Sequence, residues 1–409
     1  MKILIIDDVM LPQRKNIFGS GILRVTRDLV APLTDLGHEV IVISPSDSDT
    51  ITDEGFTHLI SSQRSRKLVD MDRSQSREYN ARYVAEIESL LPQFDFCINQ
   101  NERFLALLKV LLKSETPVMT INHGNPVGGI PDIGISGTFQ KVINAGHSVV
   151  AVSPLCQTKW NSLKYYFDDT LDTNCDINNL SFCFQYAKDF PVIDSLGYGI
   201  TIGRADIYKK PHIAMKAFEL AGIPGKTYVS YKPNMSKGEE YFNQHLTKSY
   251  TNVELFTNQD YTSTMSALAP AEVLISTWPD ESSGITALEA AERGVPSIIC
   301  ARPFNPNKRR PAGLPEHDFS APLHASEYLL PAGMYEMNTV LGTKGPANIA
   351  EIIKKMDWPL SRRQELRERT LEHLSYDKMR DGLQELINTC IEYHKDTFEG
   401  EVSVESFFS

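Results

Sequence analysis

Short apolar runs recur along the first half of the chain, and each gives way to a polar segment. The expected strands are 2–7 (KILIID), 39–44 (EVIVIS), 94–100 (FDFCINQ), 117–122 (PVMTIN) and 147–153 (HSVVAVS). Continuous apolar runs are typical of parallel strands that are buried on both faces. Helical patterns lie between them, at 22–33, 59–91 and 102–113. The alternation predicts right-handed crossovers in a doubly wound α/β domain that ends near residue 185.

The second half of the chain repeats this plan. Strands are expected at 198–204 (YGITIGR), 226–231 (KTYVSY), 252–257 (NVELFT), 272–277 (EVLIST) and 296–301 (PSIICA), and helices at 211–222, 346–357 and 374–395. We therefore predict an α/β fold of two Rossmann-like domains that face each other across a cleft. The domains span 1–190 and 191–373, and a C-terminal helix with a tail, 374–409, packs back toward the first. Such folds bind ligands at the carboxyl ends of their strands.

The composition of the chain excludes several functional classes of protein. The chain has 409 residues and a formal net charge of -11, from 41 basic and 52 acidic residues. That charge argues against a polyanion-binding surface over the whole chain, although a local basic patch is compatible with it. The six cysteines form no CxxC pair, which predicts a reduced cytoplasmic protein without a disulfide framework or zinc site. We expect neither a signal peptide nor a membrane-spanning segment, because no apolar stretch approaches about 20 residues.

In residues 279–299, PDESSGITALEAAERGVPSII, two carboxylates stand eight positions apart. The small residues Ser282-Ser283-Gly284 lie between them. A helix that begins near Ser283 would expose free backbone N–H groups and a positive dipole end, and Gly284 would let an anion approach. Glu281 before this end and Glu289 two turns along could accept hydrogen bonds from hydroxyl groups. A phosphate flanked by hydroxyl groups, as in a nucleotide sugar, fits this pattern. The alternative is an ordinary acid-rich amphipathic helix.

A second stretch, IGRADIYKKP, places Arg204 at the end of an expected strand and Lys209 five residues later. Arginine can bind phosphate with two parallel hydrogen bonds, and lysine supplies a point charge. The alternative is a solvated basic loop. Because the strand ends at the edge where such folds bind ligands, we favour a phosphate site.

These stretches resemble the C-terminal domain signature of the retaining GT-B glycosyltransferases of family 4. The resemblance lies in Gly203-Arg204 with Lys209, in the run from Glu281 to Glu289, and in Gly294-Val295-Pro296. The loop Gly19-Ser20-Gly21 and the strand-end His123 are similar to that family's N-terminal pattern. Ser283-Gly284 stands where the family usually has an aromatic residue and a glycine, which leaves the shape of the sugar pocket open.

The resemblance implies a role for each of these residues. Arg204 and Lys209 would hold the donor diphosphate, Glu289 the ribose and Glu281 the sugar hydroxyl groups. His123 would lie near the donor sugar. The remaining contacts with the donor would come from Gly19, Ser20, Gly21, Phe256, Asn258, Ser283, Gly284, Ile285 and Thr286. Transfer would proceed with retention at the front face of the sugar. No metal and no cofactor other than the nucleotide-sugar co-substrate is implied, and UDP is the nucleotide that the family favours.

The segment 301–330 is an insertion relative to this family, and it holds the basic residues Arg302, Lys308, Arg309 and Arg310. It is either a solvated loop or a clamp for an anionic acceptor. The compact chain with this insertion resembles the phage DNA α-glucosyltransferases, which modify hydroxymethylated bases, so double-stranded DNA is one expected partner. A cell-surface polysaccharide or small-molecule glycosyltransferase is the alternative, and a non-catalytic nucleotide-sugar binding protein is the alternative of another class. The sugar, the acceptor and the oligomeric state stay open.

Overall fold

The protein is described from a computed structural model that covers most of the chain. The described residues are 1–7, 21–48, 57–63, 73–124, 130–161, 163, 177–206, 209–230, 236–248, 250–277, 284–301, 335–338 and 345–399. They form two compact units, which we call unit 1 and unit 2. Unit 1 contains Met1–Gln185 and Tyr376–Ser409, and unit 2 contains Tyr186–Asn305 and Phe319–Ser375. Among the described residues, the chain passes from unit 1 to unit 2 at 185/186 and returns to unit 1 at 375/376.

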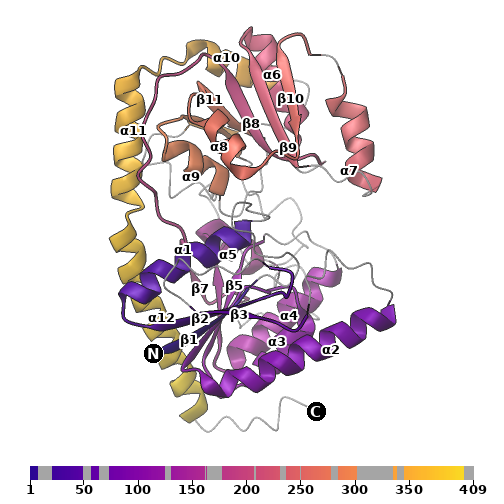
Figure 1. Ribbon diagram of the computed structural model, residues 1–409, viewed down its shortest axis with the longest axis vertical. Coiled ribbons are helices and arrows are strands. Elements are labelled where there is room, and N and C mark those ends of the chain that lie inside the picture. The colour runs from indigo at the N-terminus through magenta and orange to yellow at the C-terminus, as the bar shows by residue number, and fades with distance from the viewer. Residues whose placement is uncertain are drawn as a thin grey trace, which may run out of the picture. The chain divides into compact units, whose positions relative to one another are not determined.

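Unit 1 is built on a parallel sheet of seven strands in the order β3-β2-β1-β4-β5-β6-β7 (Figure 1). The strands are β1 (Lys2–Ile6), β2 (Glu39–Ser44), β3 (Thr57–Ile60), β4 (Phe96–Asn99), β5 (Val118–Asn122), β6 (Ser148–Ala151) and β7 (Leu180–Ser181). In β1 the four residues Ile3–Ile6 are completely buried. Helices on both faces of the sheet exclude water from the central strands, and this is why β1 is an unbroken apolar run.

Helices cover both faces of this sheet. They are α1 (Gly21–Asp35), α2 (Arg73–Leu90), α3 (Leu105–Leu111), α4 (Ile130–Asn144), α5 (Pro154–Asn161) and α12 (Tyr376–Glu399), with a 3₁₀ turn at Leu91–Gln93. α2, α3 and α4 form a row, while α12 packs against α1, β5 and β6 (Figure 1). Tyr393 on α12 donates its hydroxyl hydrogen to the carbonyl of Ile143 at 2.9 Å. The C-terminal helix therefore belongs to the N-terminal sheet.

Unit 2 is built on a second parallel sheet, of six strands in the order β10-β9-β8-β11-β12-β13. The strands are β8 (Gly199–Arg204), β9 (Gly225–Ser230), β10 (Val253–Thr257), β11 (Val273–Ser276), β12 (Ser297–Ala301) and β13 (Tyr335–Asn338). The helices are α6 (Pro211–Ala221), α7 (Ser236–Tyr241), α8 (Tyr261–Leu268), α9 (Ile285–Ala291), α10 (Gly345–Lys355) and α11 (Leu360–His373), with a π-helical turn at Phe242–Leu246. No helix in the described ranges is long and apolar enough to cross a membrane.

β11 shows how unit 2 is packed from both sides. Val273 and Ile275 lie in one apolar cluster with Phe218 of α6 and Ile349 of α10. Leu274 between them lies in another cluster, with residues of α8 and α9. Successive side chains of a strand point to opposite faces, so both faces of β11 are covered.

The observed architecture confirms the predicted α/β class with two Rossmann-like sheets. Each sheet reverses its order at one place, between β1 and β4 in unit 1 and between β8 and β11 in unit 2. Eight elements were not predicted, namely the strands β3, β7 and β13 and the helices α4, α5, α7, α8 and α11. The helix expected over 59–91 was wrong at its start, because Thr57–Ile60 forms the edge strand β3 and α2 begins only at Arg73. Edge strands such as β3 are partly exposed and lack the apolar run of a central strand.

A pair of glycines fixes the position of α6 on the sheet of unit 2. Gly199 of β8 and Gly225 of β9 are register partners. The ring of Phe218 lies over both, since a Cβ atom at Gly199 would be 2.1 Å from a ring carbon and one at Gly225 would be 2.5 Å from a ring carbon. The absence of two Cβ atoms therefore creates the space that a fully buried aromatic ring occupies.

We predict that Gly199→Ala destabilises unit 2 by about 1–3 kcal/mol through overpacking. Phe218→Leu, which shortens the opposing side chain, should cost about 1 kcal/mol alone and should relieve the overlap in the double variant. Denaturant unfolding of the wild type, both single variants and the double variant measures the coupling. Strictly additive losses would show that the Gly199–Phe218 contact does not set this packing.

Candidate functional site

A cavity lies at the carboxyl edge of the unit 2 sheet, where the strand order reverses between β8 and β11. Its walls come from the ends of these strands, from the turn before α6 and from the start of α9. The lining residues are Thr201, Ile202, Gly203, Lys209, Pro211, Leu274, Ile275, Ser276, Thr277, Gly284, Thr286, Ala287 and Ile299. At such a reversal the helical connections leave toward opposite faces of the sheet, so the strand ends between them can bind a ligand.

Lys209 enters the cavity wall from a tightly bonded turn. Its backbone N–H donates to Asp206 Oδ1 at 2.8 Å, and the first carbons of its side chain lie beside Gly203 at contact distance. Thr277 stands directly after β11, and its hydroxyl donates to the carbonyl of Lys209 and lies 3.2 Å from the carbonyl oxygen of Lys210. Thr277 is 3% exposed, so this bond is shielded from water. The lysine is therefore fixed to both strands that form the cavity.

Arg204 ends β8 and lies outside the cavity lining. Its side chain is 63% exposed, and its Nε is 2.8 Å from Asp206 Oδ2. This exposed ion pair contributes little to stability, but it orients the guanidinium at the end of the strand. Asp206 therefore contacts both cationic residues that the sequence singled out, through the side chain of Arg204 and the backbone of Lys209.

The start of α9 forms the opposite wall of the cavity. Gly284 precedes the helix in the left-handed region with φ of 68°, and no side chain caps the helix. The helix begins at Ile285 rather than near Ser283, and its first two internal bonds run from the N–H groups of Ala287 and Leu288 to the carbonyl of Gly284. Earlier N–H groups of a helix have no partner within it, so they are available to a ligand beside Thr286.

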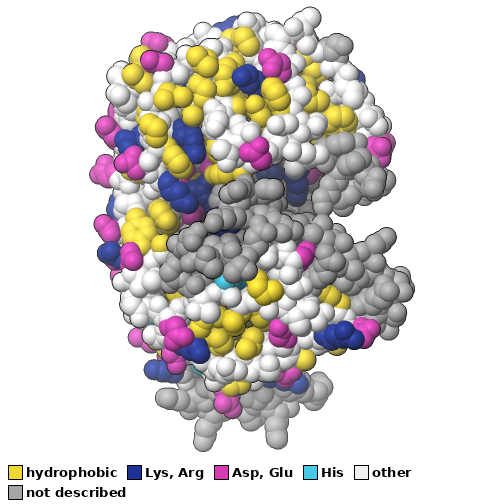
Figure 2. All heavy atoms as spheres, viewed as in Figure 1, with side chains coloured by type: hydrophobic (Ala, Val, Ile, Leu, Met, Phe, Trp, Pro, Cys, Tyr) yellow, Lys and Arg dark blue, Asp and Glu magenta, His cyan; other side chains and the backbone are white. Residues whose placement is uncertain are grey.

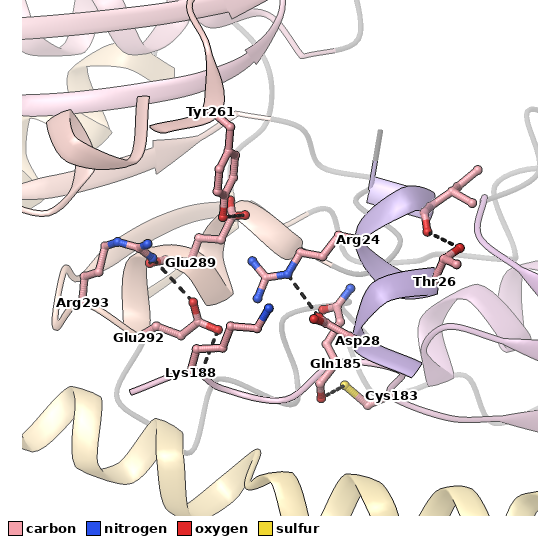
Figure 3. A network of polar contacts seen from close by, with 11 residues as sticks. Arg24, Thr26, Asp28, Cys183, Gln185, Lys188, Tyr261, Glu289, Glu292 and Arg293 are labelled. Atoms are coloured by element: carbon pink, nitrogen blue, oxygen red, sulfur yellow. Dashed lines mark hydrogen bonds and ion pairs between the residues drawn. The ribbon is translucent and has the colours of Figure 1, made fainter. Parts of the chain in front are cut away.

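Glu289 follows one turn further along α9 and is held by a long-range contact. Its side chain is only 6% exposed, and Tyr261 of α8 donates a hydroxyl hydrogen to Glu289 Oε1 at 2.9 Å (Figure 3). Arg293 donates from Nη1 to the carbonyl of the same residue at 2.8 Å. Glu289 is thus a positioned acceptor rather than one acid of a solvated helix face.

The far end of α9 is tied to the first residues of unit 2. Glu292 is fully buried, and its Oε1 accepts the backbone N–H of Lys188 at 3.1 Å (Figure 3). Arg293 lies 3.5 Å from Glu292 Oε2 and stacks on the ring of Phe190 at 3.8 Å. A buried pair with several hydrogen bonds would be costly to break, so these contacts fix the helix that carries Glu289.

Phe256 and Asn258, which were expected to contact the donor, lie outside the cavity lining. Phe256 stacks on Tyr228 with ring centroids 4.6 Å apart, and packs against a core cluster of unit 2. Asn258 is exposed, has a φ of 51° and donates its backbone N–H to the carbonyl of Val229 at 2.9 Å. Phe256 lies within β10 and Asn258 directly after it, and the strands β9 and β8 separate β10 from β11.

The equivalent edge of unit 1 holds His123, directly after β5. The half-buried His123 has Nε2 2.5 Å from Gln100 Oε1, and burial lowers the pKa of its imidazole to about 3. At the end of β1, Asp7 accepts hydroxyl hydrogens from Thr26 at 2.8 Å and Ser44 at 2.9 Å.

α1 begins at Gly21, the last residue of the expected glycine loop. One turn along this helix, the buried Arg24 pairs with Asp28, and the distance from Nε to Oδ2 is 3.2 Å (Figure 3).

Seven predicted site residues lie outside the described residues. They are Gly19, Ser20, Glu281, Ser283, Lys308, Arg309 and Arg310. Among the described ones, Lys209, Gly284 and Thr286 meet at one cavity, while Arg204, Glu289, Phe256 and Asn258 lie elsewhere in unit 2 and His123 lies in unit 1.

Sequence reasoning missed the residues that hold these groups in place. Asp206 stands two positions after Arg204 and could have been suspected from that spacing. Thr277 ends a predicted strand, but its bond to Lys209 spans 68 positions, and the bond from Tyr261 to Glu289 spans 28. Contacts over such separations depend on the strand order, which a single sequence does not reveal.

Comparison with solved structures identifies the fold. The sucrose-phosphate synthase of Thermosynechococcus elongatus superposes with a TM-score of 0.69 at 13% identity, over 96% of this chain and 99% of that chain. Anabaena HepE in complex with UDP-glucose gives 0.60 at 13% identity, over 95% and 100%. The pneumococcal O-GlcNAc transferase GtfA in complex with UDP and GlcNAc gives 0.62 at 10%, over 96% and 99%. The chain thus has the GT-B fold of these proteins.

Two other comparisons find no relative. No model of a known protein family matches the chain, and no curated protein sequence matches it. At 10–13% identity the likeness to solved structures shows the fold alone.

We predict that Thr277→Val destabilises unit 2 by about 1 kcal/mol, because the carbonyl of Lys209 loses a buried hydroxyl donor while the side-chain volume is kept. Thr277→Ser keeps the hydroxyl and is the matched control. Denaturant unfolding of the three proteins measures the difference. A valine variant as stable as the wild type, with an unstable serine variant, would contradict this role for the hydroxyl.

Proposed function

We propose that this protein is a glycosyltransferase that takes its sugar from a nucleotide sugar, with UDP as the nucleotide. The observation that carries the proposal is the meeting of Lys209, Gly284 and the start of α9 at the reversal point of the unit 2 sheet. A lysine and free helical N–H groups around one cavity suit a diphosphate. The GT-B fold supports the proposal, and two of the similar structures were solved with UDP or UDP-glucose bound.

The chemistry follows from charge that develops on the leaving group. When the bond between the sugar and the diphosphate breaks, negative charge grows on the diphosphate. Lys209 in the cavity wall and Arg204 at its strand end would stabilise that charge, together with the N–H groups of α9. Glu289, held by Tyr261, would accept hydrogen bonds from the ribose hydroxyl groups. Glu281 would do the same for the sugar.

We further propose that transfer retains the anomeric configuration and needs no metal. Both parts rest on the resemblance to the family 4 glycosyltransferases. In such transfer the leaving phosphate itself helps to deprotonate the acceptor at the front face of the sugar, so no protein carboxylate acts as a nucleophile. Arg204, Lys209 and α9 supply the positive charge that a divalent cation supplies in other transferases.

A protein that binds a nucleotide sugar without catalysis is the alternative of another class. It would hold the donor with the same residues but would not cleave it. Release of nucleoside diphosphate from a panel of nucleotide sugars, measured without acceptor and with excess chelator, separates the two. We expect slow release from UDP-linked donors and no loss of rate in chelator.

We predict that Arg204→Ala and Lys209→Ala each lower turnover by at least about a hundredfold, because each removes charge stabilisation from the leaving group. Lys210→Ala is the matched control, since Lys210 is the adjacent lysine and does not line the cavity. The measurement is the steady-state rate of nucleoside diphosphate release, with folding checked by circular dichroism. Near-normal turnover in a folded Lys209→Ala variant would refute the phosphate site.

For the acceptor we propose a hydroxymethylated pyrimidine in double-stranded DNA of a phage. The support comes from the sequence, in the basic run Lys308-Arg309-Arg310 and the resemblance to phage DNA α-glucosyltransferases. The net charge of -11 opposes DNA binding over the whole surface. On the face shown in Figure 2, however, the described acidic side chains are scattered rather than gathered in one patch.

We predict that changing Lys308, Arg309 and Arg310 together to Ser weakens DNA binding and flattens its salt dependence by about two to three units, because each phosphate contact contributes a slope near -0.9. Donor hydrolysis should change little. The measurement is a titration of a labelled hydroxymethylated duplex at several salt concentrations. Equal slopes for the two proteins would favour a polysaccharide or small-molecule acceptor instead.

A further inference from the structure

Side-chain amides organise the carboxyl edge of the unit 1 sheet where its strand order reverses. Asn99 Nδ2 at the end of β4 lies 3.3 Å from Thr120 Oγ1 on β5. Asn101 Nδ2 donates to the carbonyl of Asp7 at 2.8 Å, which joins the end of β4 to that of β1. Gln100 stands between these two asparagines, and its surroundings are therefore fixed by three strands.

Gln100 is buried and contacts a predicted site residue. Its backbone N–H donates to the carbonyl of Ile6 at 3.0 Å, and the residue is 1% exposed. Its Oε1 lies 2.5 Å from Nε2 of His123. Its own Nε2 is buried and has no hydrogen-bond partner among the described atoms. The buried amide therefore limits the orientations that are open to the imidazole it contacts.

The protonation of His123 follows from this contact. An amide oxygen carries no proton and can only accept, so the imidazole must donate from Nε2. A neutral imidazole that carries its proton on Nε2 has a lone pair on Nδ1, which makes Nδ1 an acceptor. Burial lowers the pKa of His123 to about 3, so the ring is neutral at neutral pH.

The backbone that follows His123 is fixed as well. The carbonyl of Gly124 accepts Trp160 Nε1–H at 2.5 Å and lies 3.5 Å from Cys156 Sγ. The guanidinium of Arg103 lies against Gly124, since a Cβ atom there would be 3.1 Å from Arg103 Nη2.

Asp7 follows β1 at this edge, and Glu102, Arg103 and Lys159 lie nearby. The last three act on the buried Cys156 thiol. The lowered pKa of His123 comes from burial rather than from these groups.

We propose that Gln100 is a positioning residue. By accepting the Nε2 proton of His123, it presents Nδ1 of that imidazole as an acceptor for a hydroxyl group of the substrate. The proposal rests on the proposed function, in which the substrate is a nucleotide sugar. An imidazole with the opposite tautomer would turn a donor toward the hydroxyl and would bind its oxygen instead.

Two substitutions at Gln100 distinguish a role in orienting the His123 imidazole from a purely structural role in packing. Gln100→Met keeps the length of the side chain and removes the acceptor, and Gln100→Glu keeps an acceptor and adds a charge. Gln157→Met is the matched control, because Gln157 Nε2 bonds a backbone carbonyl, that of Asn178, at 3.4 Å. For each protein, ¹⁵N chemical shifts of the histidine rings give the tautomer of His123, assigned by comparison with His123→Asn. Donor turnover is measured from about pH 5 to 8.

We expect the wild-type ring to carry its proton on Nε2 throughout this pH range. Gln100→Met should lose that preference and lower turnover about tenfold or more, the size of effect that residues orienting a functional imidazole have at metal sites. Gln100→Glu should keep the tautomer but raise the pKa of His123, because a carboxylate stabilises the imidazolium. Its turnover should therefore fall as the pH drops through the raised pKa, where Nδ1 gains a proton and can no longer accept. Gln157→Met should behave as wild type.

A wild-type ring protonated on Nδ1 would overturn the proposal. So would a Gln100→Met variant with wild-type tautomer and turnover, or a Gln100→Glu variant whose turnover has the wild-type pH dependence. Loss of turnover through instability alone would leave the pH dependence of Gln100→Glu unchanged. If no protein in the series releases nucleoside diphosphate, the proposed function fails, while the ring spectra still decide whether Gln100 sets the tautomer.

Discussion

The reversal of strand order between β8 and β11 is the constraint on which the candidate site depends. β9 and β10 follow on one side of β8, and β12 and β13 follow on the other side of β11, so the chain leaves the two central strands in opposite directions. Their carboxyl ends therefore form a cavity instead of being covered by a connection. Lys209 and Gly284 enter it because each stands in the first loop after one of these strands. Unit 1 repeats the reversal between β1 and β4, and there the strand ends hold Asp7, Gln100 and His123.

Buried polar contacts at both edges hold the groups that would meet a ligand. Thr277 fixes the turn of Lys209, Tyr261 fixes the carboxylate of Glu289, and Gln100 fixes the imidazole of His123. Each contact joins residues far apart in sequence and is partly or wholly shielded from water. In such surroundings a hydrogen bond is stronger than at the surface, and leaving one of its partners unsatisfied is costly. Within each unit, the packing around the sheet thus holds these side chains in place before a ligand binds. Such preorganisation is what electrostatic stabilisation of a leaving group would require.

Much of the fold could be predicted from local patterns, because central parallel strands are apolar on both faces and their helices are not. The runs at Ile3–Ile6 and Val273–Ile275 are of this kind. β3 was not predicted because an edge strand is half-exposed and lacks an apolar run. β13 was not predicted because it follows the long insertion and also has no comparable apolar run. Within the site, Lys209 and Gly284 could be found from their places after strands. Glu289 was identified, but its burial and its bond to Tyr261 were not, since they depend on how α8 packs against α9.

In the proposed function, the β8–β11 edge binds the diphosphate of a nucleotide sugar. A crystal structure of the protein grown with UDP tests this most directly. We expect density for the diphosphate between Gly203, the Lys209 ammonium and the first N–H groups of α9, with the ribose within hydrogen-bond distance of Glu289. UDP bound at another place in the molecule, or a cavity that stays without nucleotide at saturating UDP, would contradict it.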